Sequence, residues 1–209
     1  SFSGGGALST VSEGGNTGVR LSSSDAANHG DIGSNAVDLS YSGGSSTTKG
    51  ATGDFSTAMG DSTKASGFNS TAMGYGSTAS GGFSTAMGYE SEASGDYSIA
   101  TGLSTTASER FSTAMGLGTT ASGFASTAMG RYTVSSDYAS TVIGHYNSSG
   151  STATSAFPFS TSAPAFVIGN GTDDSSRSDA FKVMFNGDTY VSNSLYLGGT
   201  EITSTAAEL

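Results

Sequence analysis

Cysteine is absent from this chain of 209 residues, and proline occurs only twice. Without cysteine the protein cannot be a disulfide-stapled scaffold, a zinc finger or an enzyme with a catalytic thiol. Long apolar runs are missing as well, since no stretch approaches the roughly 20 residues that a membrane-spanning helix needs. We therefore expect no direct insertion of this segment into a membrane.

Basic residues are also scarce. The chain has 7 Lys and Arg against 17 Asp and Glu, a formal net charge of -10. A nucleic-acid partner requires a basic stripe, so the sequence predicts no such partner. Hydrophobic residues make up only 34% of the chain, while glycine fills 32 positions. This composition is typical either of disorder or of a repeat fold whose narrow interior accepts only small residues.

A strict 14-residue period favours the repeat fold. The pentapeptide Ser-Thr-Ala-Met-Gly occupies residues 56–60 and returns six more times, intact or with close substitutes. The glycines that end these pentapeptides are Gly60, Gly74, Gly88, Gly102, Gly116, Gly130 and Gly144. A second signature, Ala-Ser-Gly at residues 65–67, recurs in the same register, so seven units span residues 54–151. A constant short period without proline is typical of a solenoid in which each unit forms one coil.

Each unit contains two short segments in which side chains alternate, and this alternation predicts two strands joined by tight glycine-containing corners. Ser56, Ala58 and Gly60 share one face and are small enough for a narrow interior. Thr57 and Met59 share the opposite face, which is predicted to point outward. The inverse assignment, with the methionines as the coil core, stays open at this point. Either way, the sequence predicts an all-β, parallel β-roll.

Stacking the units places one outward position of each in a column. We call this the methionine column: Met59, Met73, Met87, Thr101, Met115, Met129 and Ile143. A continuous exposed apolar column is a patch that soluble monomers avoid. The prediction is therefore that it is buried between chains, in a homo-oligomer whose axis runs parallel to the stack.

Residues 69–81, Asn-Ser-Thr-Ala-Met-Gly-Tyr-Gly-Ser-Thr-Ala-Ser-Gly, resemble the head repeat of trimeric autotransporter adhesins of the YadA-like type. The resemblance covers all seven units and implies that the β-roll is left-handed and that three rolls form a homotrimer. It also implies that the trimer interface contains Met59, Met73, Met87, Met115, Met129 and Ile143. The sequence departs from the family in having mostly Thr and Met where the family has Val and Ile.

The resemblance implies a non-enzymatic adhesin head that attaches to host cells, matrix or other surfaces. Its partner would be a host-surface protein or a glycan, and its location would be extracellular, at the cell surface or attached to the outer membrane. Similar repeats occur in phage and viral fibres, so a receptor-binding tail fibre on a virion is the alternative. A passive structural spacer is a third.

The segments outside the repeat predict separate roles. Residues 1–53 are interpreted as an N-terminal cap with strands leading into the roll, including a strand pair within residues 31–39. Both prolines fall in residues 152–165, which are predicted to form a connector. Residues 166–209 are predicted to form a β-hairpin-rich neck that leads to a stalk following Leu209. We thus interpret the chain as a fragment of a longer protein.

Two finer predictions concern this neck. Residues 165–171 fit a degenerate eighth rung, followed by hairpins over residues 181–191 and 195–202. Residues 205–208 have the form of a helix capping box, which predicts the start of a helix or coiled coil.

No residue pattern indicates catalysis, a cofactor or a resident metal ion. His145 falls in a variable turn position, and no base and orienting group accompany it. Asp173, Asp174 and Asp179 form an acidic cluster whose spacing fits no EF-hand loop, so an exposed acidic turn is the favoured interpretation over a calcium site.

Two surface patterns remain. Variable turn positions supply the candidate ligand contacts Tyr75, Tyr89, Arg131, Tyr132 and Tyr146, since Tyr and Arg are the usual anchors of protein interfaces. A hydroxyl column could order water, as in flat ice-binding solenoids; its members are Thr63, Ser77, Ser91, Thr105, Thr119 and Thr133. The neighbouring column is charged and irregular, which argues against ice binding.

Overall fold

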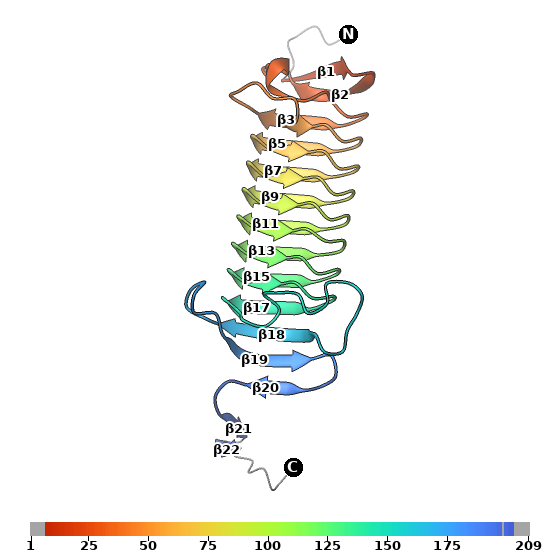
Figure 1. Ribbon diagram of the computed structural model, residues 1–209. Helices are drawn as coiled ribbons and strands as arrows, with labels where there is room; N and C mark the ends of the chain where they lie inside the picture. The colour runs from red at the N-terminus through yellow and green to blue at the C-terminus, as the bar shows by residue number, and fades with distance from the viewer. Residues whose placement is uncertain (1–6, 198, 203–209) are drawn as a thin grey trace.

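The computed structural model describes residues 7–197 and 199–202 and shows an elongated stack of strands (Figure 1). The predicted helix start at residues 205–208 lies outside the described residues. The fold is an all-β solenoid, and the only helical element in the described part of the chain is a short 3-10 turn, η1 (Ala26–Asn28).

Each 14-residue rung contains one five-residue strand and one two-residue strand. The long strands are β5 (Thr57–Asp61), β7 (Thr71–Tyr75), β9 (Thr85–Tyr89), β11 (Ile99–Leu103), β13 (Thr113–Leu117), β15 (Thr127–Arg131) and β17 (Thr141–His145). The short strands are β4 (Gly50–Ala51), β6 (Lys64–Ala65), β8 (Thr78–Ala79), β10 (Glu92–Ala93), β12 (Thr106–Ala107), β14 (Thr120–Ala121) and β16 (Val134–Ser135). The short strands form a seven-stranded parallel sheet, and the long ones are the centre of a 13-stranded sheet. Pairing joins each residue to its equivalent one rung away, as Met59 to Met73.

The coil extends beyond the exact repeat at both ends. β3 (Val37–Tyr41) pairs in parallel with β5, so the solenoid begins before residue 54. β18 (Pro164–Asn170) pairs in parallel with β17, which confirms the predicted eighth rung. The strand pair predicted within residues 31–39 is wrong, because only β3 forms there. Ile32 instead fills the core of the first turn, with 0% of its surface exposed.

Antiparallel strands close both ends of the parallel stack. At the N-terminus, β1 (Leu8–Glu13) and β2 (Asn16–Leu21) form a hairpin whose turn residues Gly14 and Gly15 have positive φ, and β2 then pairs with β3. At the other end, β19 (Asp179–Met184) pairs with β18 and then with β20 (Thr189–Val191). β21 (Leu195–Leu197) and β22 (Thr200–Ile202) form a separate hairpin. An antiparallel end strand covers the edge of the last rung and does not offer the pairing pattern of the repeat, so no further rung can add to it.

The interior is built from alanine and small hydroxyl side chains. Ala58 and its equivalents from Ala72 to Ala128 are 0% exposed, and so is the second alanine column that begins at Ala65. Met59, next to Ala58, lies on the outer face and is 37% exposed. The predicted assignment of faces is therefore confirmed, and the inverse assignment is wrong.

The repeated glycine has a different role from the predicted one. Gly60 was expected to be a small interior residue, but it is only half-buried and has φ +113. A Cβ at this position would overlap the carbonyl oxygen of Gly74 in the next rung. Glycine is thus required by the backbone conformation and by the close contact between rungs, not by the space inside the coil.

Candidate interaction surfaces

The methionine column lies on the outer face of the 13-stranded sheet. Its members pair in register from rung to rung, so the side chains stack directly over one another. Met87 is 40% and Met115 45% exposed, while Met73, Thr101 and Ile143 are half-buried. The chain therefore presents a straight apolar stripe that no other described part of it covers.

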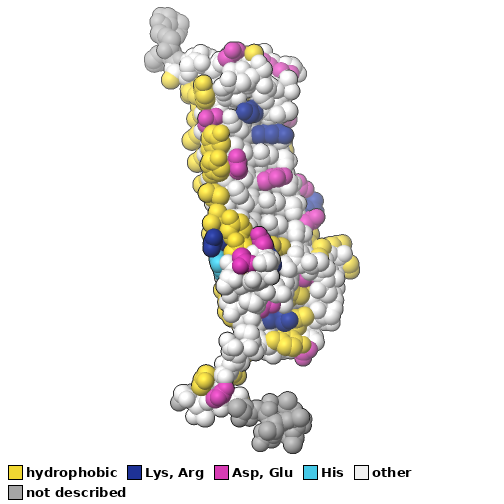
Figure 2. Space-filling model, turned by 60° about the vertical axis from the view of Figure 1, so that its left-hand side comes forward, with side chains coloured by type: hydrophobic (Ala, Val, Ile, Leu, Met, Phe, Trp, Pro, Cys, Tyr) yellow, Lys and Arg dark blue, Asp and Glu magenta, His cyan; other side chains and the backbone are white. Residues whose placement is uncertain are grey.

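A second apolar stripe follows the corner where each long strand ends. Figure 2 shows it as a yellow band along one side of the coil that ends near basic and histidine side chains. We call it the variable column: Asp61, Tyr75, Tyr89, Leu103, Leu117, Arg131 and His145. Tyr75 and Tyr89 stack with their ring centroids 4.9 Å apart, and both are nearly half exposed.

The other three candidate contacts gather at the lower end of this stripe. The Arg131 guanidinium lies 5.3 Å from the Tyr132 ring and 5.7 Å from the Tyr146 ring. Its Nη1 lies 2.8 Å from His145 Nε2. Arg177 covers Tyr146 at 5.4 Å, and Tyr146 is only 7% exposed. Tyr146 is thus corrected from a surface contact to the buried floor of a basic and aromatic cluster.

The five candidates therefore fall into two groups. The stacked pair of Tyr75 and Tyr89 lies near the upper end of the variable column, and the cluster around Arg131 lies near its lower end. Leu103 and Leu117 occupy the rungs between them. A single small ligand cannot contact both groups, since two whole rungs separate them.

A third stripe, which we call the aromatic ladder, was not predicted from the sequence. It consists of one ring from each of seven consecutive rungs: Phe55, Phe68, Phe83, Tyr97, Phe111, Phe124 and Tyr138. Neighbouring rings have centroids 4.9–5.7 Å apart. The rings alternate irregularly between two adjacent sequence positions, so neither position read alone shows a column of aromatics. Counting aromatics per unit over both positions would have found it.

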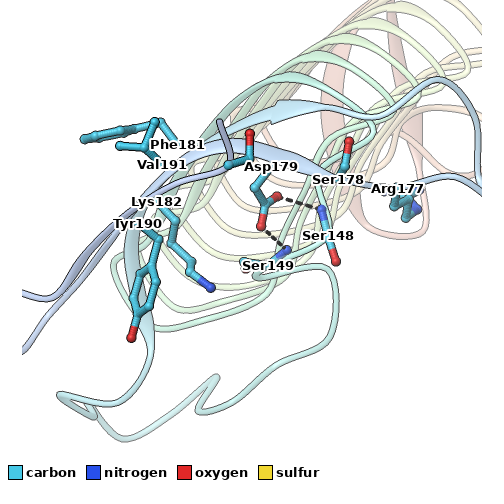
Figure 3. Close-up of a pocket in the computed structure, with 10 residues that line it drawn as sticks. Ser148, Ser149, Arg177, Ser178, Asp179, Phe181, Lys182, Tyr190 and Val191 are labelled. Atoms are coloured by element: carbon cyan, nitrogen blue, oxygen red, sulfur yellow. Dashed lines mark hydrogen bonds between the residues drawn. The ribbon is translucent and has the colours of Figure 1, made fainter. Parts of the chain in front are cut away.

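The C-terminal segment contains a cavity of about 390 Å³ (Figure 3). The Asp179 carboxylate at its wall accepts hydrogen bonds from the backbone N–H groups of Ser148 and Ser149, at 2.7 and 2.9 Å. Lys182 Nζ lies 4.6 Å from the centre of the Tyr190 ring. Asp179 thus ties β19 to the loop that follows β17.

The acidic cluster does not converge on a common point. Asp173 accepts hydrogen bonds from the hydroxyl and N–H of Ser175, and these bonds, the hydroxyl first, lower its pKa. Asp174 pairs with Arg177 at 2.6 Å, while Asp179 accepts hydrogen bonds from the backbone N–H groups of Ser148 and Ser149. Within residues 7–197 and 199–202, no group of three or more acidic or histidine side chains could hold a metal ion.

The hydroxyl column considered for ice binding is inside the coil. Thr63, Thr105 and Thr119 are 0% exposed, as are their equivalents on the other rungs to within 1%. Ser77 donates to the carbonyl oxygen of Gly88, and Ser91 to that of Gly102. The hydroxyls of Thr63, Thr119 and Thr133 are buried without a hydrogen-bond partner in the described part of the chain. A buried column cannot order surface water, so the ice-binding interpretation is wrong.

His29 is buried in the N-terminal turn, and its environment is that of a structural ion network. Its Nδ1 lies 3.0 Å from Asp38 Oδ2, and the same oxygen accepts a hydrogen bond from Arg20 Nε at 3.2 Å. The hydroxyl of Ser40 donates to the other carboxylate oxygen at 2.6 Å. Because the hydroxyl bonds to the carboxylate and not to the imidazole, the group lacks the order of a nucleophile, base and orienting acid.

Comparison with protein families identifies the repeat. The YadA head domain repeat matches residues 51–77, 65–91, 93–119 and 121–147. The repeats within residues 51–147 thus belong to the YadA head repeat family, which confirms the resemblance seen in the sequence. No curated protein gives a significant match to the chain. No helix in the described part of the chain is long and apolar enough to cross a membrane.

Proposed function

We propose that the protein is a left-handed β-roll head that assembles as a homotrimer and attaches a cell surface to host cells, matrix or another surface. The methionine column carries this proposal. A soluble protein rarely leaves so continuous an apolar stripe in water, and YadA head repeats are characteristic of trimeric autotransporter adhesins. Three stripes around an axis parallel to the stack would bury one another. The corresponding location is extracellular, at the cell surface.

Attachment in this proposal is shallow and multivalent. The Tyr75–Tyr89 pair and the Arg131 cluster offer exposed aromatic and cationic groups, and three copies on one shaft raise avidity without a deep pocket. The partner class is a host-surface protein or a glycan. The same trimer on a virion, as a receptor-binding fibre, is the second candidate function, because the repeat family alone does not identify the particle that carries it.

Trimerisation predicts a specific effect of Met87→Asp combined with Met115→Asp. Each trimer would then place six carboxylates in a dry central contact, where unpaired charges are costly. Light scattering should give three times the 20.6 kDa chain mass for the parent protein and a single chain mass for this variant. Thr78→Asp combined with Thr120→Asp is the matched control, since both lie at the outer position of the short strands, which already holds Glu92, and Thr78 also neighbours Lys64. A monomeric parent protein would contradict the proposal.

Attachment predicts that Tyr75→Ser combined with Tyr89→Ser weakens binding without changing assembly. Removing both exposed rings should reduce retention on immobilised matrix proteins, on a glycan array or on host cells by at least about tenfold, because three copies lose the contact together. Glu92→Ser, on the outer face of the short strands, should leave retention unchanged. If the parent protein binds none of these surfaces, the passive spacer is the better description.

A further inference from the structure

The aromatic ladder is an apolar stripe on the surface to which the proposed function gives no role. Its five upper rings, Phe55, Phe68, Phe83, Tyr97 and Phe111, are each 47–51% exposed. We propose that the ladder packs against a second copy of this chain and forms the other half of the contact between protomers, beside the methionine column. This inference rests on the trimer of the proposed function.

The arrangement of the rings favours a protein surface over a saccharide. A sugar stacks on an open aromatic face, but the faces in the middle of the ladder are already covered. Phe83 and Tyr97 stack at 4.9 Å with 1° between their planes, and Tyr97 and Phe111 stack at 5.2 Å with 18°. Stacked rings present their edges outward, and apolar side chains of another protein can pack against such edges.

The exposed area of the ladder is a large part of what one partner contributes to a stable interface. A buried aromatic side chain covers roughly 150–250 Å². The five rings that are about half exposed therefore offer on the order of 350–600 Å². One partner in a standard interface contributes about 800 Å². The methionine column is a single row of side chains that are less than half exposed, so a stable trimer gains from a second apolar surface of this size.

The repeat spacing indicates that the occupant is the same chain. The rings recur once per rung, at the spacing of hydrogen-bonded strands, about 4.8 Å. A partner must remain apolar and straight over the four steps between the five exposed rings to cover them. A second copy of this coil has that period on each of its faces, and the heterologous contacts of a cyclic trimer join two different patches on every chain.

The connector shows that the ladder accepts cover from other apolar side chains. Phe157 lies 5.7 Å from Phe124 and 5.9 Å from Tyr138, and Phe159 lies 6.1 Å from Tyr138. These two lowest rungs are half-buried, whereas the five above them are exposed. The chain thus covers the end of its own ladder, and the remaining length is the part left for the neighbouring protomer.

The absence of cysteine allows a direct test in the assembled protein. A single thiol introduced by Tyr97→Cys should react with a maleimide at least about tenfold more slowly in the parent background than in the Met87→Asp, Met115→Asp background. Glu92→Cys, on the face of the short strands, should react at the same rate in both. Equal rates for Tyr97→Cys in a trimer and in a monomer would overturn the inference.

A second measurement replaces rings of the aromatic ladder with asparagine, a residue that one rung already carries at the equivalent position. Asn69 occupies the same rung position as Phe83, Tyr97 and Phe111, with the same positive φ, so Asn at these three positions keeps the backbone unstrained. We expect this triple variant to keep the circular dichroism spectrum of the parent and to raise the dissociation constant of the trimer at least about 100-fold. A trimer of unchanged affinity would overturn the inference and leave the proposed function intact. A monomeric parent protein would remove the proposed function and the inference with it.

Discussion

Gly88→Ala is expected to lower the midpoint of thermal unfolding by about 8–16 °C. Gly88 has φ +123, a conformation that L-residues rarely adopt, and an added Cβ would overlap the carbonyl oxygen of Gly102 in the next rung. That oxygen belongs to a strand paired on both sides, so it cannot move away. Backbone strain combined with such an overlap costs about 4 kcal/mol or more. In a chain of this size each kcal/mol corresponds to roughly 2–4 °C.

The matched control is Gly76→Ala, in the corner that follows β7. Gly76 also has positive φ, but the nearest atom to its Cβ would be the flexible Glu90 side chain, at 3.3 Å. Ser62 and Glu90 occupy the same position on neighbouring rungs with φ near +50 to +57. The expected loss is only about 1–2 kcal/mol. If the two variants unfolded at the same temperature, the contact between rungs would not be the reason that glycine recurs in this column.

The repeat made most of the coil predictable. An alternation such as that of Ala58 and Met59 assigns the inner and outer faces, because successive strand side chains point to opposite sides. The alternation does not explain why Gly60 is glycine, however. Its positive φ and the close approach of two rungs are properties of the backbone, and residue size does not reveal them. The alternation holds at Thr63, which is buried on the same face as Ala65, so the pattern itself places its hydroxyl inside the coil and not on the surface.

The candidate surfaces were less predictable than the fold. Tyr146 belongs to the same class of corner residue as Tyr132, but Arg177, far along the chain, lies over its ring and adds to its burial. The aromatic ladder escaped detection because Phe68 and Phe83 use different positions of their rungs and meet only in three dimensions. The ends of the stack were predicted coarsely, since the residues of the first turn do not follow the period.

The N-terminal end contains the second large expected effect. Asp38→Ala should destabilise the first turn of the coil by about 2–4 kcal/mol, because it removes the more deeply buried of the two carboxylates that pair with Arg20. Arg20 is 2% and Asp38 0% exposed, and Arg20 stays charged at any accessible pH. The substitution also removes the acceptor for the Ser40 hydroxyl and the carboxylate next to His29. Glu13 would remain as the only carboxylate paired with Arg20.

The measurement is hydrogen exchange of backbone amides, resolved along the chain. In the Asp38→Ala variant, protection should fall first in β1, β2 and β3, while β9 to β13 keep theirs, because each rung depends mainly on its neighbours. Asp96→Ala is the control. Asp96 pairs with Arg110 at 3.2 Å, but both side chains are about half exposed, and its pKa is lowered first by the N–H of Gly82 and then by Arg110. Such an exposed pair contributes at most about 1 kcal/mol. Uniform loss of protection along the whole stack in Asp38→Ala would mean that the coil unfolds as one unit and that the buried ion network stabilises all of its rungs together.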